Sequence, residues 1–306
     1  MKNKIIAVFL AMILFSLCGC SYSSPQKNDR LSVVCSIFAP YDFARQVAGD
    51  RAEVKMLLPA GVESHSYEPT PRSIIELQDA DIFFYVSEHT ETWVGQMLDS
   101  ISDSGVETFE LAEELGIEVN GHHHDEHDEH GETDEHIWTS LKTAADMVKC
   151  IAEKLGELDR ENSEYYLKNA EEYSQKILNL KSEISELVAK SERKEIISGS
   201  RFAMKNFTNE FGLEFTAAFD SCVDNTEPGA AVMAQIIDKI RTDKLPVIFY
   251  EELTEPKIAK AVADETGVKM LLLHSCHNIS SQELKRGETY LSLMTQNYLN
   301  LKEALN

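Results

Sequence analysis

The sequence predicts an α/β protein with two lobes, each a parallel sheet flanked by helices, joined by one long rigid helix. Three observations predict this fold. Short apolar runs alternate with helical patterns in the first half of the chain, and the same alternation returns in the second half. Between the halves, residues 161–190 contain no Gly or Pro and carry apolar residues at four-three spacing. Strands alternating with helices favour parallel sheets that are covered on both faces.

Four strands are expected in each half, with helices between them. The expected strands are 31–38, 52–59, 79–87, 106–112, 194–199, 213–219, 245–251 and 268–274, and the expected helices are about 40–49, 69–79, 90–102, 202–211, 229–244, 256–266 and 282–304. We therefore divide the chain into an N-terminal lobe (31–158), an interlobe helix (159–192) and a C-terminal lobe (193–306). The pattern of the interlobe helix also suits a coiled-coil dimer. Its place between two α/β blocks favours a monomer with a helix of roughly 45 Å that limits hinge motion between the lobes.

The start of the chain has the composition of an export signal. Lys2 and Lys4 precede an apolar run over 5–17 that is too short to span a bilayer as a helix. The run ends in Leu-Cys-Gly-Cys, which resembles the bacterial lipoprotein cleavage signal and places the lipid on Cys20. We expect a signal peptide over 1–19, a lipidated tether over 20–30, and anchoring to the outer face of the bacterial cytoplasmic membrane. The alternative is an ordinary signal peptide with incidental cysteines.

The composition excludes some partners and leaves others open. A formal net charge of −23 with no basic patch argues against nucleic-acid binding. Acidity by itself specifies no ligand. An exported compartment permits disulfides. We expect buried free thiols at Cys35 and Cys150 and consider one disulfide candidate, Cys222 with Cys276.

The histidines are concentrated in one segment. Six of the ten lie in Gly121–His136, together with seven carboxylates and no apolar residue. Imidazoles and carboxylates at this density favour zinc, copper or nickel ions, whereas the alternative is a solvated charge run. We expect a loop over 121–135 that binds metal loosely at accessory positions, through His122, His123, His124, His127 and His130.

Three other histidines occupy positions typical of ligand sites in open α/β sheets, which lie beyond the carboxyl ends of the strands. His65 follows the second expected strand, His136 separates the histidine-rich loop from a helix, and His274 ends the last expected strand. Any one of them is more often a packing or surface histidine. Together they predict one metal site. His277 is expected beyond the strand end, and His89 on the surface.

At these residues the chain resembles the zinc- and manganese-binding lipoproteins of ABC importers. ESHSYEPTP is similar to the first-ligand motif of that family and DEHIW to its second; NSEYYLKNAEEY and YLSLMTQNYLNLKEAL are similar to its interlobe and last helices. The histidine-rich insertion is typical of the zinc branch. The resemblance implies two lobes on a rigid helix, a metal in the cleft between them, and a permease as partner.

Two ligand positions depart from the family pattern. Alignment on Phe211-Gly212-Leu213 places Arg201 where the family has its third ligand, and arginine cannot ligate a metal. The fourth ligand is usually Asp, and the matching position holds His274. The site then consists of His65, His136 and His274 with a fourth group still to be assigned. The candidates are a water, a residue of the 121–135 loop, Glu251, or a Cys222 thiolate.

The expected function is capture of zinc and its delivery to an importer, without catalysis. Three histidines and a water suit tetrahedral zinc, and the missing carboxylate position makes manganese less suitable. The alternatives are capture of manganese or another divalent metal, and a surface metal chaperone or adhesin with the same fold. A zinc-dependent hydrolase with Glu251 as base is a further alternative, although the sequence has no HExxH helix and no nucleophile elbow.

Overall fold

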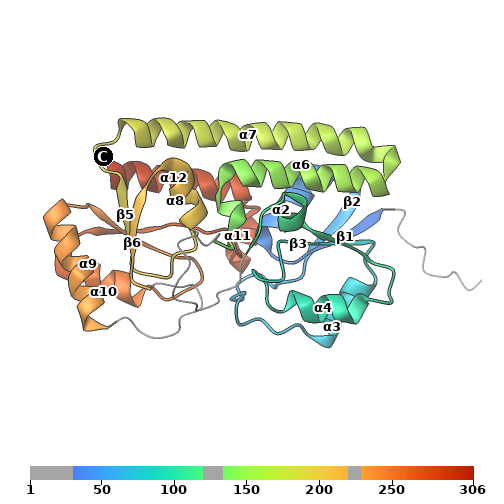
Figure 1. The fold of residues 1–306 in the computed structure, drawn as a ribbon, viewed down its shortest axis with the longest axis horizontal. Coiled ribbons are helices and arrows are strands. Elements are labelled where there is room, and N and C mark those ends of the chain that lie inside the picture. The colour runs from blue at the N-terminus through green and yellow to red at the C-terminus, as the bar shows by residue number, and fades with distance from the viewer. Residues whose placement is uncertain (1–29, 120–133, 220–228) are drawn as a thin grey trace, which may run out of the picture. The chain divides into compact units, whose positions relative to one another are not determined.

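Two four-stranded sheets with parallel neighbours organise the chain (Figure 1). They are seen in a computed structural model that describes residues 30–119, 134–219 and 229–306, and residues 31–306 form one compact unit. The strands are β1 (Leu31–Cys35), β2 (Ala52–Met56), β3 (Ile82–Tyr85), β4 (Glu107–Glu110), β5 (Glu195–Ser198), β6 (Glu214–Ala217), β7 (Val247–Tyr250) and β8 (Lys269–Leu272). Each lies inside a predicted range, and the two-lobed α/β class is confirmed.

The two sheets have the same topology. The strand order is β2-β1-β3-β4 in the first and β6-β5-β7-β8 in the second. In both sheets, the second strand in the sequence lies on one side of the first strand (β1 or β5), and the third strand lies on its other side. Ligands of open α/β sheets bind beyond the carboxyl ends of the strands at this switch point, which here lies between β1 and β3 and between β5 and β7.

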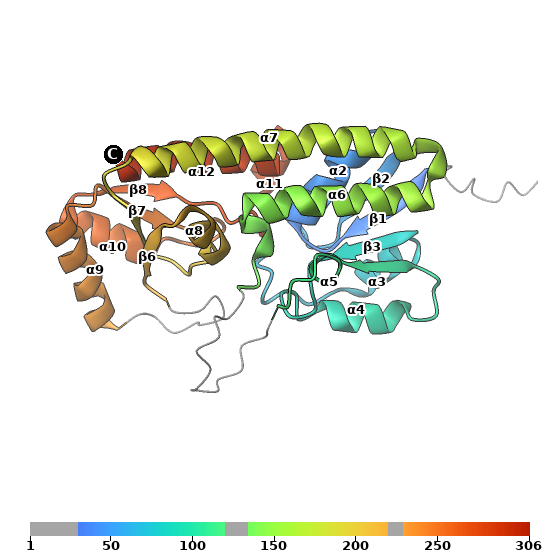
Figure 2. The same cartoon turned by 45° about the horizontal axis from the view of Figure 1, so that its top comes forward.

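The helices cover the sheets (Figures 1 and 2). In chain order they are α2 (Phe38–Ala48), α3 (Pro71–Gln78), α4 (Val94–Ile101), α5 (Leu111–Glu114), α6 (Leu141–Leu158), α7 (Ser163–Lys190), α8 (Lys205–Phe211), α9 (Ala230–Asp243), α10 (Lys257–Thr266), α11 (Ser281–Arg286) and α12 (Tyr290–Leu305), with 3₁₀ turns η1 (Ile137–Thr139) and η2 (Arg160–Asn162).

The expected terminal helix over 282–304 is wrong as a single element. It is two helices, because Gly287 ends α11 in the left-handed conformation with φ 77°. Thr289 then starts α12 with a capping box, in which its side chain and that of Ser292 bond reciprocally to the backbone.

Helix α7 is the long helix that the four-three spacing predicted, and it has 28 residues. Figure 2 shows it running beside α6 and α12. Its buried face includes Tyr166, Tyr173, Ile177, Ile184 and Val188. The predicted domain boundaries at 158 and 193 stay predictions.

One hydrophobic core runs through both lobes. A single cluster joins Phe84 of β3, Ile177 of α7, Phe249 of β7 and Met294 of α12. A smaller cluster packs β5 and β7 against α9 and α10, through residues such as Ile197, Ile248 and Val262. The lobes therefore share one packed core instead of meeting only at their surfaces.

Among the described residues, no helix has the length and apolar character needed to cross a membrane.

Candidate metal centre

Three histidines from distant parts of the chain converge. His65, His136 and His277 each offer a ring nitrogen, and these nitrogens lie within 4.8 Å of one another. The ring centroids are 6.1 Å apart for His65–His136, 5.1 Å for His65–His277 and 5.2 Å for His136–His277. The three rings therefore converge on one point.

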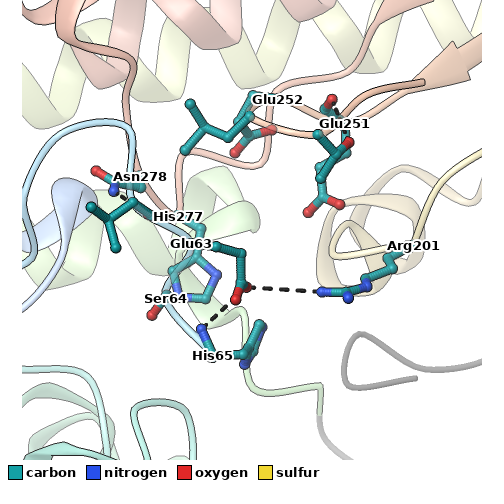
Figure 3. Close-up of a pocket in the computed structure, with 11 residues that line it drawn as sticks. Glu63, Ser64, His65, Arg201, Glu251, Glu252, His277 and Asn278 are labelled. Carbon is teal, nitrogen blue, oxygen red and sulfur yellow. Dashed lines mark hydrogen bonds and ion pairs between the residues drawn. The ribbon is translucent and has the colours of Figure 1, made fainter. Parts of the chain in front are cut away.

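His65 lies in the loop between β2 and α3, at the carboxyl end of the first sheet. The Glu63 carboxylate shapes this loop, since it accepts the backbone N–H of His65 at 3.1 Å and that of Ser66 at 2.9 Å. His65 is half-buried. This turn presents the imidazole to the cavity (Figure 3).

His136 is fully enclosed and its orientation is fixed by Asp134. The Asp134 carboxylate accepts the His136 backbone N–H at 2.9 Å and lies 3.0 Å from Nδ1. A proton on Nδ1 leaves Nε2 with its lone pair, and Nε2 is buried without a hydrogen bond. Burial lowers the pKa of His136, but the carboxylates of Asp134, Glu135 and Glu251 outweigh it and raise the pKa. A carboxylate behind a ligating histidine is a common support for metal sites.

His277 follows β8 and is buried. Its backbone is held on both sides: its N–H donates to Ser275 Oγ at 3.2 Å, and its carbonyl accepts the Phe38 N–H at 3.2 Å. Its Nε2 has no hydrogen-bond partner. Burial, with the neighbouring His136 and His65, holds the pKa of His277 well below its usual value. The ring is therefore neutral and able to coordinate at neutral pH.

The structure groups His277, and not the predicted His274, with His65 and His136. His274 Nδ1 accepts the Cys276 backbone N–H at 2.9 Å, and its Nε2 is 4.0 Å from Glu283. Its own backbone N–H donates to Asn297 of α12. This ring faces the packing behind the cavity because the strand ends at Leu272 and the chain turns before it reaches the site.

Arg201 and Glu251 line the same cavity. Arg201 follows β5, and its Nη1 lies 3.9 Å from Glu63 Oε1. Glu251 follows β7 directly. Burial and the neighbouring Glu252 carboxylate raise the pKa of Glu251 to about 8, while His136 and Arg201 act in the opposite direction. The cavity has a volume of about 30 Å³.

The remaining predicted positions fall into two groups. Cys276 is buried and carries a free thiol, and its candidate disulfide partner Cys222 lies outside the described residues, so that pairing stays a prediction. Cys35 is a buried free thiol as expected, and Cys150 is free but only half-buried. Outside the described residues lie Cys20, His122, His123, His124, His127, His130 and Cys222.

Sequence reasoning missed His277 because strand periodicity ends before it. Its position depends on contacts from other parts of the chain: Trp138 Nε1 donates to the Ser275 carbonyl at 2.8 Å, and the Trp138 ring lies 5.1 Å from the His277 ring. The only local signal was a second histidine shortly after a strand end.

The donor set indicates the chemistry of the site. Tetrahedral zinc has Zn–N distances of about 2.0–2.1 Å, which separates its ligands by roughly 3.4 Å. The ring nitrogens of the three histidines lie up to 4.8 Å apart, so small side-chain movements would bring them to this separation. Neutral imidazoles suit zinc, copper, nickel or iron better than the oxygen-preferring cations.

Comparison with known proteins identifies the family of this chain. Residues 33–304 match the family described as zinc-uptake complex component A, periplasmic (ZnuA). The high-affinity zinc uptake system protein ZnuA of Bacillus subtilis is 33% identical over 99% of this chain and 97% of its own length. The zinc-binding lipoprotein AdcA of Streptococcus pneumoniae is 31% identical over 96% of this chain. This chain spans about 60% of the length of that relative.

Solved structures show the same fold. The Zn(II)-bound ZnuA-like domain of Streptococcus pneumoniae AdcA is similar with a TM-score of 0.74 and 30% identity, covering 90% of this chain and 99% of that domain. The family match spans nearly all of the described residues, both lobes and all three converging histidines. The chain therefore belongs to the ZnuA family of periplasmic zinc-uptake components.

Proposed function

We propose that this chain captures zinc outside the cytoplasm and delivers it to the permease of an ABC importer. The observation that carries the proposal is the convergence of His65, His136 and His277, two of which bury an Nε2 with no hydrogen-bond partner. Unpaired buried nitrogens are costly unless a ligand satisfies them. The names of the relatives, a zinc-binding lipoprotein and a zinc uptake system protein, support the same metal.

Zinc is favoured over manganese by the ligand set. Three imidazoles suit zinc, whereas manganese prefers oxygen ligands. Family membership supports capture without a reaction, in contrast to a zinc-dependent hydrolase. In this proposal the histidine-rich segment over 121–135 binds ions loosely at accessory positions.

The proposed location is the outer face of the bacterial cytoplasmic membrane, with lipid on Cys20. The export signal and cleavage motif at the start of the chain support it. A relative named as a lipoprotein supports it as well. Mass spectrometry of the membrane fraction should find a diacylated N-terminal cysteine. A Cys20→Ala variant should instead accumulate as unprocessed precursor.

Zinc titration tests the capture site. His65→Ala, His136→Ala and His277→Ala should each weaken the tightest zinc site by at least about ten-fold. His89 is exposed and belongs to no part of the cavity, so His89→Ala is the matched control and should bind as the parent does. Unchanged tight binding in all three variants would overturn this assignment of the site.

Growth tests delivery. A strain lacking this chain should grow poorly when zinc is limiting, and added zinc should restore growth. The full-length protein should complement the strain, but the His277→Ala variant should not. Normal zinc-limited growth of the deletion strain would contradict the import role and favour a surface metal chaperone or adhesin.

A further inference from the structure

The three-histidine group leaves one position of a tetrahedral ion open. Zinc sites in proteins are almost always four-coordinate, and His65, His136 and His277 supply three ligands. The pocket beside the histidines is also lined by Arg201 and by the carboxylates of Glu63, Glu251 and Glu252. Figure 3 shows the Glu251 carboxylate pointing into the pocket that His65, His277 and Arg201 also line.

Arg201 and Glu251 share this side because of the sheet topology. Strands β5 and β7 are neighbours at the switch point of the second sheet, where Ser198 pairs with Phe249. The backbone N–H of Glu251 donates to Ser200 Oγ at 3.3 Å, next to Arg201. Both side chains therefore leave from adjacent strand ends. Since guanidinium has no lone pair to donate, Glu251 is the one of the two that can ligate.

The other carboxylates lining the pocket are already engaged. Glu63 accepts two backbone N–H groups of its own loop and lies 3.9 Å from Arg201. Glu252 accepts the backbone N–H of Ser275 at 2.9 Å and its hydroxyl at 2.5 Å. Within the described part of the chain, the Glu251 carboxylate makes no hydrogen bond or ion pair of this kind.

We propose that Glu251 supplies the fourth, anionic ligand to the captured metal, in place of the side chain that Arg201 cannot provide. The inference rests on the proposed function. Charge supports it: three neutral imidazoles leave a divalent ion uncompensated, and a buried charge needs a partner. Glu251 provides one negative charge beside the ion, while Glu63 balances Arg201.

The size of the cavity supports a direct ligand. A water needs roughly 10–15 Å³ of such volume, so about 30 Å³ holds on the order of two waters. That space admits a bare ion and a carboxylate oxygen that rotates inward.

Glu251→Gln tests the proposal in the purified protein. We expect zinc affinity, measured by competition with a chromophoric chelator, to fall by at least about ten-fold. Glu255 lies on the same turn and is exposed, so Glu255→Gln is the matched control and should bind as the parent does. Affinity of Glu251→Gln within two-fold of the parent would overturn the proposal.

A double-mutant cycle tests whether the two positions share one vertex of the coordination sphere. Arg201→His offers an imidazole on the same side. Glu251→Gln should therefore reduce zinc affinity less in the Arg201→His protein than in the parent. An equal loss of zinc affinity in both proteins would overturn the shared vertex.

The cobalt(II) form of the parent should show the intense absorption of a four-coordinate ion, and Glu251→Gln should shift it. An identical spectrum would also count against ligation.

Two further variants separate this proposal from its alternatives. Glu135 Oε1 lies 3.9 Å from His136 Nε2, which makes Glu135 the rival ligand. A loss of affinity with Glu135→Gln and none with Glu251→Gln would overturn the proposal in favour of Glu135. If His65→Ala and His277→Ala abolish tight binding and Glu251→Gln does not, the capture site stands and only the fourth ligand is wrong. If none of them changes binding, the proposed function itself fails.

Discussion

The surroundings of His136 and His277 shift the pKa values of these two buried histidines in opposite directions. Asp134 holds His136 and, with nearby carboxylates, raises its pKa, whereas burial and two imidazoles depress the pKa of His277. His277 is therefore neutral before an ion arrives. His136 binds a proton more tightly than an ordinary histidine and must release it to ligate. His277 can therefore bind an ion without losing a proton, whereas binding through His136 releases one and depends on pH.

Zinc affinity should fall as the pH drops from about 8 to about 6, because protons compete with the ion for His136 and for the proposed ligand Glu251, whose pKa is raised to about 8. The sign follows from the raised pKa of His136 in the metal-free protein. Protons therefore compete with the ion at a higher pH than they would for an ordinary histidine. Calorimetry in buffers of different ionisation enthalpy should detect proton release on binding. Asp134→Asn should lower the release and weaken binding by on the order of ten-fold. A pH-independent affinity would contradict this view.

His277→Ala and His274→Ala should have different effects. Loss of His277 removes a ligand and should weaken zinc binding by at least about ten-fold. Loss of His274 leaves the buried N–H of Cys276 without its acceptor and should lower the free energy of unfolding by about 1–3 kcal/mol. Zinc affinity of His274→Ala should stay close to that of the parent. Chelator competition and urea unfolding of both variants would show a reversal if His274 were the ligand.

At the scale of elements, the segment after β8 joins the lobes at the site. Trp138 from η1 donates to the Ser275 carbonyl, and Glu252 after β7 accepts from the Ser275 backbone and hydroxyl. Asn278 donates to the carbonyls of Pro59 and Val62, at 2.9 Å and 2.6 Å. These bonds couple the position of His277 to that of the loop carrying His65.

Asn278→Ala should therefore affect both stability and binding. It leaves two backbone carbonyls without their donor, which should cost about 1–3 kcal/mol in unfolding free energy. It also releases the His65 loop, so zinc affinity should fall even though no ligand is removed. Asn179→Ala, at an exposed position of α7, is the control and should change neither quantity. Wild-type affinity in Asn278→Ala would show that the loop is positioned independently.

At the scale of the whole molecule, a buried carboxylate joins three helices. Asp42 of α2 accepts from the Tyr173 hydroxyl of α7 at 2.8 Å and from the Tyr290 backbone N–H at the start of α12 at 2.8 Å. It also pairs with Arg45 at 2.5 Å. Together with the core that runs through both lobes, this junction ties the long helix to each of them.

Asp42→Asn should lower the free energy of unfolding by about 1.5–3 kcal/mol, because it removes the charge of a buried hydrogen-bond acceptor and of the partner of the half-buried Arg45. Urea unfolding of the metal-free protein measures this loss. Asp50→Asn provides the control, since Asp50 is exposed and pairs only with the exposed Arg51 among the described residues. Equal stabilities of the two variants would show that the junction contributes little.

The sequence predicted the fold class, the position of each strand that the structure describes, and the long helix, and it singled out His65 and His136, which the structure brings together. These features are local: apolar periodicity reports which face of an element is buried, and a strand end reports where a loop begins. The break at Gly287 was equally local but was missed, because the apolar pattern continued across it.

Packing of the whole chain brings His277 to this pair and places Arg201 and Glu251 in one pocket. His277 reaches the cavity through contacts with Trp138 and Phe38, residues far away in the sequence. Arg201 and Glu251 become neighbours only because β5 and β7 are adjacent in the sheet. A metal centre depends on distances between segments, and those distances are set by packing of the whole chain rather than by the spacing of residues along it.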